Sequence, residues 1–244
     1  MADWLCEHSP VFYAADKSSF EGMNLMAAPL LQTERLAPGD AEIIDWRGCG
    51  IHIEFLPQDQ SPETLRKRAL LAGNLTVQEH LERHLVNLPD VQGLFYDHRA
   101  GEAADYICVT KNAEDEVNVS FYHCKGAGGP PSGGRVGDVY EVAGQLVKSV
   151  YYCNVPTIVQ HMEDRMLPRH TSPSYFVRGN RADVTQLLKT TPATKLTFSV
   201  IGVQPGIRRS AINAHLSDLM AFCISYARQG GAAKAYWLVN EPEN

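Results

Sequence analysis

Three polar residues, Asp105, His123 and Lys125, lie at the ends of two runs that the sequence pattern predicts to be neighbouring strands. Asp105 opens the first of these strands and Lys125 ends the second. In an antiparallel hairpin the start of one strand lies beside the end of the next, so both charges gather at one edge of the sheet. Side chains two apart on a strand share a face, so His123 and Lys125 point together while Cys124 points away.

Hydrolysis of a phosphodiester bond is the chemistry that suits these residue types. A hard cation such as Mg²⁺ neutralises the charge that develops at the phosphorus, and it is held by one or two carboxylates, carbonyls and several waters. Asp105 would supply the carboxylate. Lys125 would stabilise the hydroxide form of the attacking water or offset charge on the phosphate. A structural ion pair between Asp105 and Lys125 is the alternative that the sequence leaves open.

Hydrophobic periodicity predicts the elements that must position these residues. Apolar residues recur at helical spacing from Val77 to Leu88, and Pro89 ends that amphipathic helix. Three strand-like runs joined by polar loops follow and form a meander. Helices and strands then alternate, and in chain order the expected elements lie at 76–88, 93–96, 104–110, 117–125, 139–150, 156–169, 195–203, 211–229 and 235–239. This order predicts an α/β fold with a mixed sheet flanked by helices.

The runs GEAADYICV and VSFYHCKG, followed by a glycine-rich loop and a helix, resemble the catalytic core of the PD-(D/E)XK nuclease superfamily. In that superfamily a helix, a three-stranded meander, a second helix and a fourth strand present an Asp from the second strand and a Glu-x-Lys pair from the third. Asp105 matches the Asp and Lys125 matches the Lys. The stretch from HCKGAGGPP to GRVGDVYEVAGQLVKSV is also similar to a module of bacterial defence helicases and restriction-type proteins. The resemblance covers residues 76 to 203 and depends largely on the order of elements.

The resemblance implies a restriction-endonuclease-like fold and a metal-dependent DNA endonuclease of an antiviral defence or restriction system, with Mg²⁺ or Mn²⁺ as cofactor. It implies DNA as substrate and a helicase or ATPase as partner, while self-association into a homo-oligomer stays open. Arg135, Gln145 and Lys148, just before and on the second helix, would grip a phosphate of the DNA. The alternatives are a nuclease-like fold that has lost cutting and binds DNA or a helicase, and a structural accessory subunit of a defence complex.

His123 stands where the superfamily has Glu or Asp. Imidazole suits Mn²⁺ better than Mg²⁺, and it stops donating its lone pair when it is protonated below about pH 6.5. Two groups could complete the metal site: the backbone carbonyl of Cys124, or the carboxylate of Glu79 on the first helix. Glu79 fits a solvated helix residue equally well, and Gln78 and Glu82 on the same helix remain competing candidates. Glu102 is a weaker metal ligand candidate because it lies in a turn before Asp105.

Three other arrangements are weaker as sites. His80 and His84 lie four apart on the first helix, which is the spacing of a zinc-ligand pair, but the run HLERH lacks the Glu that follows the first His in metalloproteases. The glycine-rich run 126–134 lacks the GK[ST] ending of a phosphate-binding loop. Cys124 is disfavoured as a nucleophile with His123, because adjacent strand residues face opposite sides.

Composition and charge limit the classes of protein that fit. The 244 residues carry a formal net charge of −6, so any DNA contact must come from a local basic patch. The six cysteines are too widely spaced for a zinc knuckle, and the N-terminal run lacks a secretory pattern, so we expect a cytoplasmic protein. An N-terminal extension is expected over 1–60, with a hairpin near 12–20 and a strand at 49–55. The nuclease-like domain is expected over 61–244.

Overall fold

The computed structural model describes residues 35–57, 59–129, 131–167 and 174–241, together with three short strands nearer the N-terminus. The chain divides into two compact units, Met1–Glu34 and Arg35–Asn244. In the first unit the described strands form an antiparallel sheet of β1 (Val11–Tyr13), β2 (Ser19–Glu21) and β3 (Asn24–Met26). The hairpin expected near 12–20 is therefore confirmed as β1 and β2.

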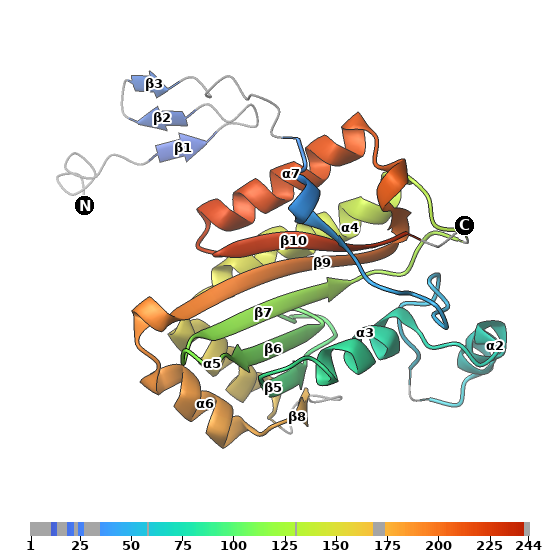
Figure 1. Ribbon diagram of the computed structural model, residues 1–244, viewed down its shortest axis with the longest axis horizontal. Coiled ribbons are helices and arrows are strands. Elements are labelled where there is room, and N and C mark those ends of the chain that lie inside the picture. The colour runs from blue at the N-terminus through green and yellow to red at the C-terminus, as the bar shows by residue number, and fades with distance from the viewer. Residues whose placement is uncertain are drawn as a thin grey trace. The chain divides into compact units, whose positions relative to one another are not determined.

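The larger unit is built on a seven-stranded mixed sheet with the order β4-β10-β9-β7-β6-β5-β8 (Figure 1). In chain order its strands are β4 (Ala41–Ile43), β5 (Val91–Tyr96), β6 (Tyr106–Lys111), β7 (Val117–Cys124), β8 (Tyr175–Arg178), β9 (Leu196–Arg208) and β10 (Lys234–Asn240). Strands β5, β6 and β7 form the expected antiparallel meander. Strand β9 runs parallel to β7, and β10 runs parallel to β9. The α/β fold with a mixed sheet is confirmed.

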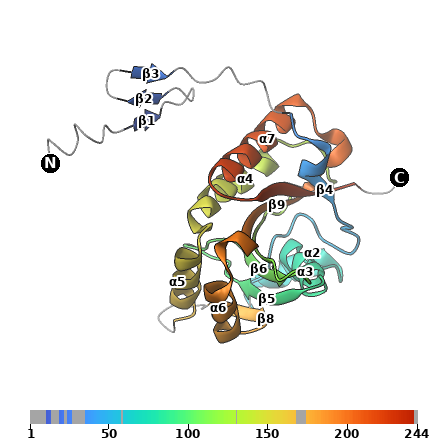
Figure 2. The ribbon, with the colours of Figure 1, turned by 60° about the vertical axis from the view of Figure 1, so that its left-hand side comes forward.

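The described helices cover both faces of this sheet. Figure 2 shows α4, α5 and α7 along one face and α3 on the opposite face. In chain order the helices are α2 (Pro62–Leu71), α3 (Val77–Val86), α4 (Gly137–Ser149), α5 (Val155–Arg165), α6 (Arg181–Thr190) and α7 (Ala214–Gln229). Within the residues that the structure describes, no helix combines the length and apolar character that a membrane crossing requires.

Alternation along β7 explains why the core has two parts. Val119 and Phe121 lie in the hydrophobic cluster shared with helices α4 to α7. Tyr122 and Cys124 lie in the second cluster, which includes the apolar residues of α3. Because side chains two apart on a strand share a face, this alternation puts His123 on the α4 face and Cys124 on the α3 face.

The segment 49–55 is a loop, so the strand expected there is wrong. Its backbone carbonyls accept hydrogen bonds from the first turn of α3. The N–H of Val77 donates to Ile53 O and the N–H of Gln78 donates to Glu54 O, each at 3.0 Å. The first N–H groups of a helix have no partner within the helix, and this loop satisfies two of them. The same contacts carry Glu54 to the edge of the sheet where Asp105 lies.

The division of the chain after Glu34 also differs from the boundary expected at residue 60. Strand β4 pairs in parallel with β10, so residues before 60 belong to the larger unit. Three further elements, α2, β8 and α6, were not expected. Helix α2 buries only Thr64 and Leu71, which is too little apolar periodicity to be visible in the sequence.

Candidate metal centre

Asp105 and His123 meet at one edge of the sheet, as the predicted hairpin requires. In the register of β6 and β7, Tyr106 lies opposite Tyr122, so that the next positions outward are Asp105 and His123. Both side chains are buried, with 1% and 0% of their surface exposed. A charged carboxylate can remain at such a buried position only if donors surround it.

Three donors surround the Asp105 carboxylate. The backbone N–H of Cys124 donates to Oδ2 at 2.7 Å, and the side-chain amide of Gln78 donates to Oδ1 at 2.8 Å. The Nδ1 atom of His98 also contacts Oδ1. These donors come from β7, from α3 and from the loop between β5 and β6, so three separate elements fix the orientation of one carboxylate.

Five side chains around this carboxylate form what we call the Asp105 cluster: Glu54, His98, Glu102, Asp105 and His123. Among the described residues they make two sets that could each hold a metal ion, and both sets include Asp105. Glu54 and His98 complete one set, and Glu102 and His123 complete the other. Within each set, one ligand atom from every residue lies within 4.8 Å of the others.

The hydrogen bonds of His123 indicate which of its ring nitrogens is free to bind a metal. Nε2 contacts the hydroxyl oxygen of Ser149, which lies 3.0 Å from the carbonyl of Ala103 and 3.1 Å from that of Gln145. Because Ser149 uses its single proton on a carbonyl, its oxygen accepts the Nε2 proton of His123. Nδ1 then carries a lone pair, and in the described part of the chain it is buried without a partner.

Burial and neighbouring charges shift the pKa values of several cluster residues. Burial raises the pKa of Glu54, although a hydrogen bond from Lys125 opposes that shift. Burial and the charge of Asp105 raise the pKa of Glu102. Burial would lower the pKa of His98, but its hydrogen bond to Asp105 and the charges around it raise that pKa overall. A bound cation would relieve this repulsion between carboxylates.

Burial has the opposite effect on the imidazole of His123. It lowers the pKa of His123 to about 4, with the charge of Asp105 opposing the shift. The ring is therefore neutral at physiological pH, which is the form that donates a lone pair to a metal. The expected loss of the lone pair near pH 6.5 does not apply to this buried ring.

Lys125 lies next to the cluster and is paired with carboxylates other than Asp105. Its Nζ is 3.0 Å from Oε2 of Glu54 and 2.6 Å from Oε2 of Glu141 on α4. Burial would lower the pKa of Lys125, but hydrogen bonds to Glu141 and Glu54 raise it, so the amine stays charged. The alternative of a direct ion pair between Asp105 and Lys125 is therefore wrong.

Glu79, one of the expected metal ligands, takes another role. The Glu79 carboxylate accepts a hydrogen bond from the backbone N–H of Thr76 at 2.8 Å, and so completes a capping box at the start of its own helix. The neighbouring residue, Gln78, is the one that reaches Asp105. At Cys124 the backbone N–H donates to Asp105, and the expected binding of a metal by its carbonyl remains a prediction.

Arg135 holds the glycine-rich loop in place, and its expected contact with a DNA phosphate remains a prediction. Its guanidinium donates to the carbonyl oxygens of Gly129 at 2.6 Å and Pro131 at 3.0 Å. It also pairs with the carboxylate of Asp138 at 2.9 Å. These three contacts give the guanidinium group a structural role.

Gln145 and Lys148, both on α4, interact with members of the cluster. The Gln145 amide donates to Glu102 at 3.3 Å, while its Oε1 is buried without a partner among the described residues. Lys148 is exposed on α4; its charge opposes the rise in the pKa of Glu102 and adds to the lowering of the pKa of His123. Their expected contact with a DNA phosphate remains a prediction.

A second buried network fixes the loop that carries His98 and Glu102. Asp97, which is fully buried, accepts hydrogen bonds from His161 at 2.6 Å, Arg165 at 2.5 Å and Ser174 at 2.7 Å. The Arg165 guanidinium also donates to the carbonyls of Asp97 and Ala100. Helix α5 therefore anchors this loop, although α5 contributes no residue to the cluster itself.

The other arrangements that the sequence suggested have structural explanations. His80 hydrogen-bonds the carbonyl of Asp45 at 2.7 Å and stacks on Trp46, with 5.0 Å between the ring centroids. Burial raises the pKa of the Cys124 thiol well above its usual range, which disfavours a thiolate nucleophile.

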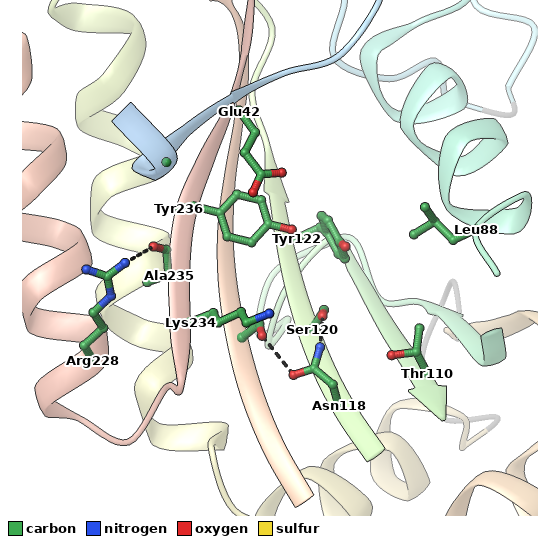
Figure 3. Close-up of a pocket in the computed structure, with 12 residues that line it drawn as sticks. Glu42, Leu88, Thr110, Asn118, Ser120, Tyr122, Arg228, Lys234, Ala235 and Tyr236 are labelled. Atoms are coloured by element: carbon green, nitrogen blue, oxygen red, sulfur yellow. Dashed lines mark hydrogen bonds between the residues drawn. The ribbon is translucent and has the colours of Figure 1, made fainter. Parts of the chain in front are cut away.

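A separate pocket of about 400 Å³ lies on the sheet over β7, β9 and β10 (Figure 3). Polar side chains line it, and several of them bond to one another. Asn118 accepts a hydrogen bond from Ser199 at 2.8 Å and donates one to Ser120 at 2.7 Å. The pocket includes no residue of the Asp105 cluster.

Comparison of the chain with known proteins returns no matching family model, no matching curated protein and no matching solved structure. The function must therefore be argued from the mixed sheet and from the buried carboxylate and imidazole groups at its edge.

Proposed function

We propose that this protein is a metal-dependent nuclease of the PD-(D/E)XK type that hydrolyses phosphodiester bonds in DNA. The observation that carries the proposal is the gathering of Asp105, His123 and Lys125 at one sheet edge, together with the other members of the Asp105 cluster. The element order α3-β5-β6-β7-α4-β9 supports a restriction-endonuclease-like core. In this interpretation α5, β8 and α6 are an insertion between α4 and β9.

The donors present fit a divalent cation. Asp105 would be the central ligand, since it belongs to both sets of the cluster, and the free Nδ1 of His123 would be a second. A cluster that mixes imidazole with carboxylates favours Mn²⁺ over Mg²⁺. When bound, the cation would activate a water molecule and neutralise charge on the phosphate.

The chain's own residues would position the reaction. Gln78 and the Cys124 backbone keep the Asp105 carboxylate in one orientation. Lys125 remains charged beside Glu54, where its ammonium group can stabilise a hydroxide or the charge on the phosphate oxygens. Lys148, exposed on α4 near the cluster, would contact a neighbouring phosphate of the DNA.

We further propose that the nuclease acts within an antiviral defence or restriction system with a helicase or ATPase as partner. This step depends on the similarity of the run from HCKGAGGPP to GRVGDVYEVAGQLVKSV to modules of such systems. A helicase would also supply unwound DNA. Co-purification of the chain with proteins encoded beside it, followed by ATPase assay, tests this step.

One observation favours the second candidate function, an inactive nuclease-like module that binds DNA. The ammonium group of Lys125 is held between the carboxylates of Glu54 and Glu141, so it must leave at least one of them to act on a substrate. An inactive module would retard DNA on a gel without cutting it in any divalent metal.

Nicking of supercoiled plasmid DNA separates the two functions. The wild-type protein should nick plasmid with Mn²⁺, more slowly with Mg²⁺ and not with EDTA. Asp105→Asn should abolish nicking, because the amide lacks the charge that holds the cation. Asp115→Asn is the matched control, since Asp115 lies in the turn at the far end of the same hairpin. Equal activity of the two variants would contradict the proposal.

A further inference from the structure

A cavity of about 490 Å³ opens directly beside the Asp105 cluster, between α3, α2 and the edge of the sheet. His98 and Gln78, both hydrogen-bonded to Asp105, are part of its lining. Ligand pockets in proteins commonly have volumes of about 300–1,000 Å³, so this cavity is large enough for part of a substrate. A group bound in this cavity would therefore lie next to His98, which is itself a candidate metal ligand.

Aromatic rings form a continuous wall in this cavity. Phe55 packs against His98 with 4.3 Å between ring centroids, and Tyr96 lies 6.1 Å from His98. Tyr96 also packs against Tyr106 at 5.2 Å and Tyr175 at 5.4 Å. Tyr175 lies on the edge strand β8 and is 46% exposed. The wall therefore leads from the cluster to the protein surface.

Polar groups in the cavity are suited to the edge of a nucleobase. The Tyr106 hydroxyl donates to Oε2 of Glu82 at 3.1 Å, and the Tyr96 hydroxyl donates to Oε1 of Gln78 at the same distance. The Glu82 carboxylate has further acceptor capacity through its second oxygen. A carboxylate accepts hydrogen bonds from the exocyclic amino groups of bases.

Two guanidinium groups, those of Arg68 on α2 and Arg99 in the loop between β5 and β6, also line the cavity. Both residues are exposed, in a chain whose formal net charge is −6. Arg99 has a φ of 146°, a backbone conformation that residues other than glycine rarely adopt. Its backbone N–H donates to Glu102 at 2.5 Å, so the strained loop conformation is held by the Asp105 cluster. Strain of this kind is concentrated at functional sites.

We propose that this aromatic pocket receives one unpaired nucleobase of the DNA strand that is cut. The base would stack on Tyr96 and Tyr175, and Arg68 and Arg99 would contact the flanking phosphates. In a duplex the faces of a base are covered by its neighbours, so only a base in a single strand or one turned out of the helix can enter such a pocket. This proposal rests on the proposed nuclease function and names its substrate class as DNA with unpaired nucleotides.

Binding measured without cleavage tests the pocket directly. Fluorescence anisotropy in EDTA would compare a labelled single-stranded DNA oligonucleotide with the duplex of the same sequence. The wild-type protein should bind the single strand more tightly. Tyr175→Ala should weaken that binding about 5- to 150-fold, which is the range for loss of one base–aromatic stack. Tyr175→Phe keeps the ring and should bind almost as tightly as the wild type.

Tyr226→Ala is the matched control, because Tyr226 is 44% exposed but lies on α7, which packs on the opposite face of the sheet. Equal affinities of Tyr175→Ala and Tyr226→Ala, or equal binding of duplex and single strand, would overturn the pocket proposal. The plasmid assay separates this failure from failure of the nuclease proposal. A protein that nicks plasmid but binds independently of Tyr175 disproves the pocket alone. A protein that binds through Tyr175 but never nicks disproves the nuclease activity and keeps the pocket.

Discussion

Lys125 is the residue through which the proposed nuclease activity is tested most directly. Replacing it with alanine removes a positive charge that would act on the developing charge of the reaction, and we expect the nicking rate to fall about 100- to 1,000-fold. Stability should change little, because the side chain is 36% exposed and its ion pairs are partly solvated. Single-turnover nicking rates and urea unfolding curves would measure the two effects.

Lys111 provides the control for that substitution. Its side chain is equally exposed, at 36%, and pairs with Asp115 at 2.7 Å at the opposite end of the hairpin. Lys111→Ala should nick plasmid at the wild-type rate. A Lys125→Ala protein that also cuts at the wild-type rate would remove Lys125 from the mechanism.

His123 should make stability depend on pH in metal-free protein. Its pKa is about 4 in the folded state and about 6.5 when unfolded, so between these values the unfolded chain binds the extra proton. The free energy of unfolding contributed by this residue is therefore present above pH 6.5 and is lost as the pH falls, by roughly 3 kcal/mol near pH 4. Urea unfolding in EDTA at a series of pH values would measure this slope.

His123→Gln isolates the contribution of the imidazole, because the amide does not titrate while the other groups of the cluster remain. The variant should show a shallower decline in stability between about pH 6.5 and pH 4 than the wild type. Identical slopes for the two proteins would mean that the imidazole does not stay neutral in the folded state.

The cluster residues at strand ends, Asp105 and His123, could be placed together from the sequence. The cluster residues Glu54 and His98, which lie on loops, could not. The alternation of β6 and β7 was sufficient to bring Asp105 beside His123. Glu54 and His98 were missed because their positions depend on how two loops turn back onto the sheet. Glu102, noted as a weaker candidate, belongs to the cluster. The run DHRAGEAAD, residues 97–105, contains three cluster members and was the available signal.

At the scale of elements, the Asp97 network determines whether the loop between β5 and β6 can present His98 and Glu102. Asp97→Asn removes the charge that pairs with His161 and Arg165 while Arg165 remains buried. Breaking a buried pair in this way destabilises proteins by roughly 3–5 kcal/mol. We expect a loss of that size in urea unfolding, together with weaker Mn²⁺ binding under conditions where the variant is still folded.

Asp45→Asn is the comparison for Asp97→Asn, since Asp45 pairs with Arg47 at the surface with 57% of its side chain exposed. Surface pairs contribute about 0–1 kcal/mol, so this variant should unfold at nearly the wild-type urea concentration. Equal stabilities of the two variants would show that the Asp97 network does not hold the loop.

Elements with a strong amphipathic pattern could be predicted from the sequence. Elements whose conformation depends on hydrogen bonds to other segments could not. Helix α3 combines a capping box at Thr76 with buried apolar residues at helical spacing, so its start and its face were both visible. The segment 49–55 alternates like a strand, but its hydrogen bonds go to the first turn of α3 and the start of the glycine-rich loop. A segment forms a strand only where the edge of a neighbouring strand is free to pair with it. The local sequence of 49–55 does not show whether such an edge exists.

At the scale of the whole molecule, the boundary after Glu34 predicts which shortened chains still bind metal. A chain that begins at Arg35 keeps every residue of the Asp105 cluster and should bind Mn²⁺ as the full chain does. A chain that begins at residue 61, the boundary expected from the sequence, loses β4 and Glu54 and should bind Mn²⁺ more weakly. Circular dichroism and Mn²⁺ titration of both chains would check this. Equal binding by the two chains would place Glu54 outside the site.

The overall α/β architecture was predictable because the alternation of helical and strand periodicity survives in most elements. The size of the sheet was not predictable. Strands β4 and β8 have three and four residues and lie at the two edges of the sheet, where pairing with one neighbour defines them. Short edge strands carry too few residues for a period of two to be recognised.

Calorimetric titration of the metal-free protein with Mn²⁺ tests most directly whether the Asp105 cluster is a metal site. The wild-type chain should bind Mn²⁺ with heat that is absent in Asp105→Asn and unchanged in Asp115→Asn, because Asp105 belongs to both possible ligand sets. His123→Gln should bind more weakly, since it lacks the Nδ1 lone pair. Wild-type binding that persists unchanged in Asp105→Asn, or no Mn²⁺ binding by the wild type, would contradict the metal site and the nuclease function built on it.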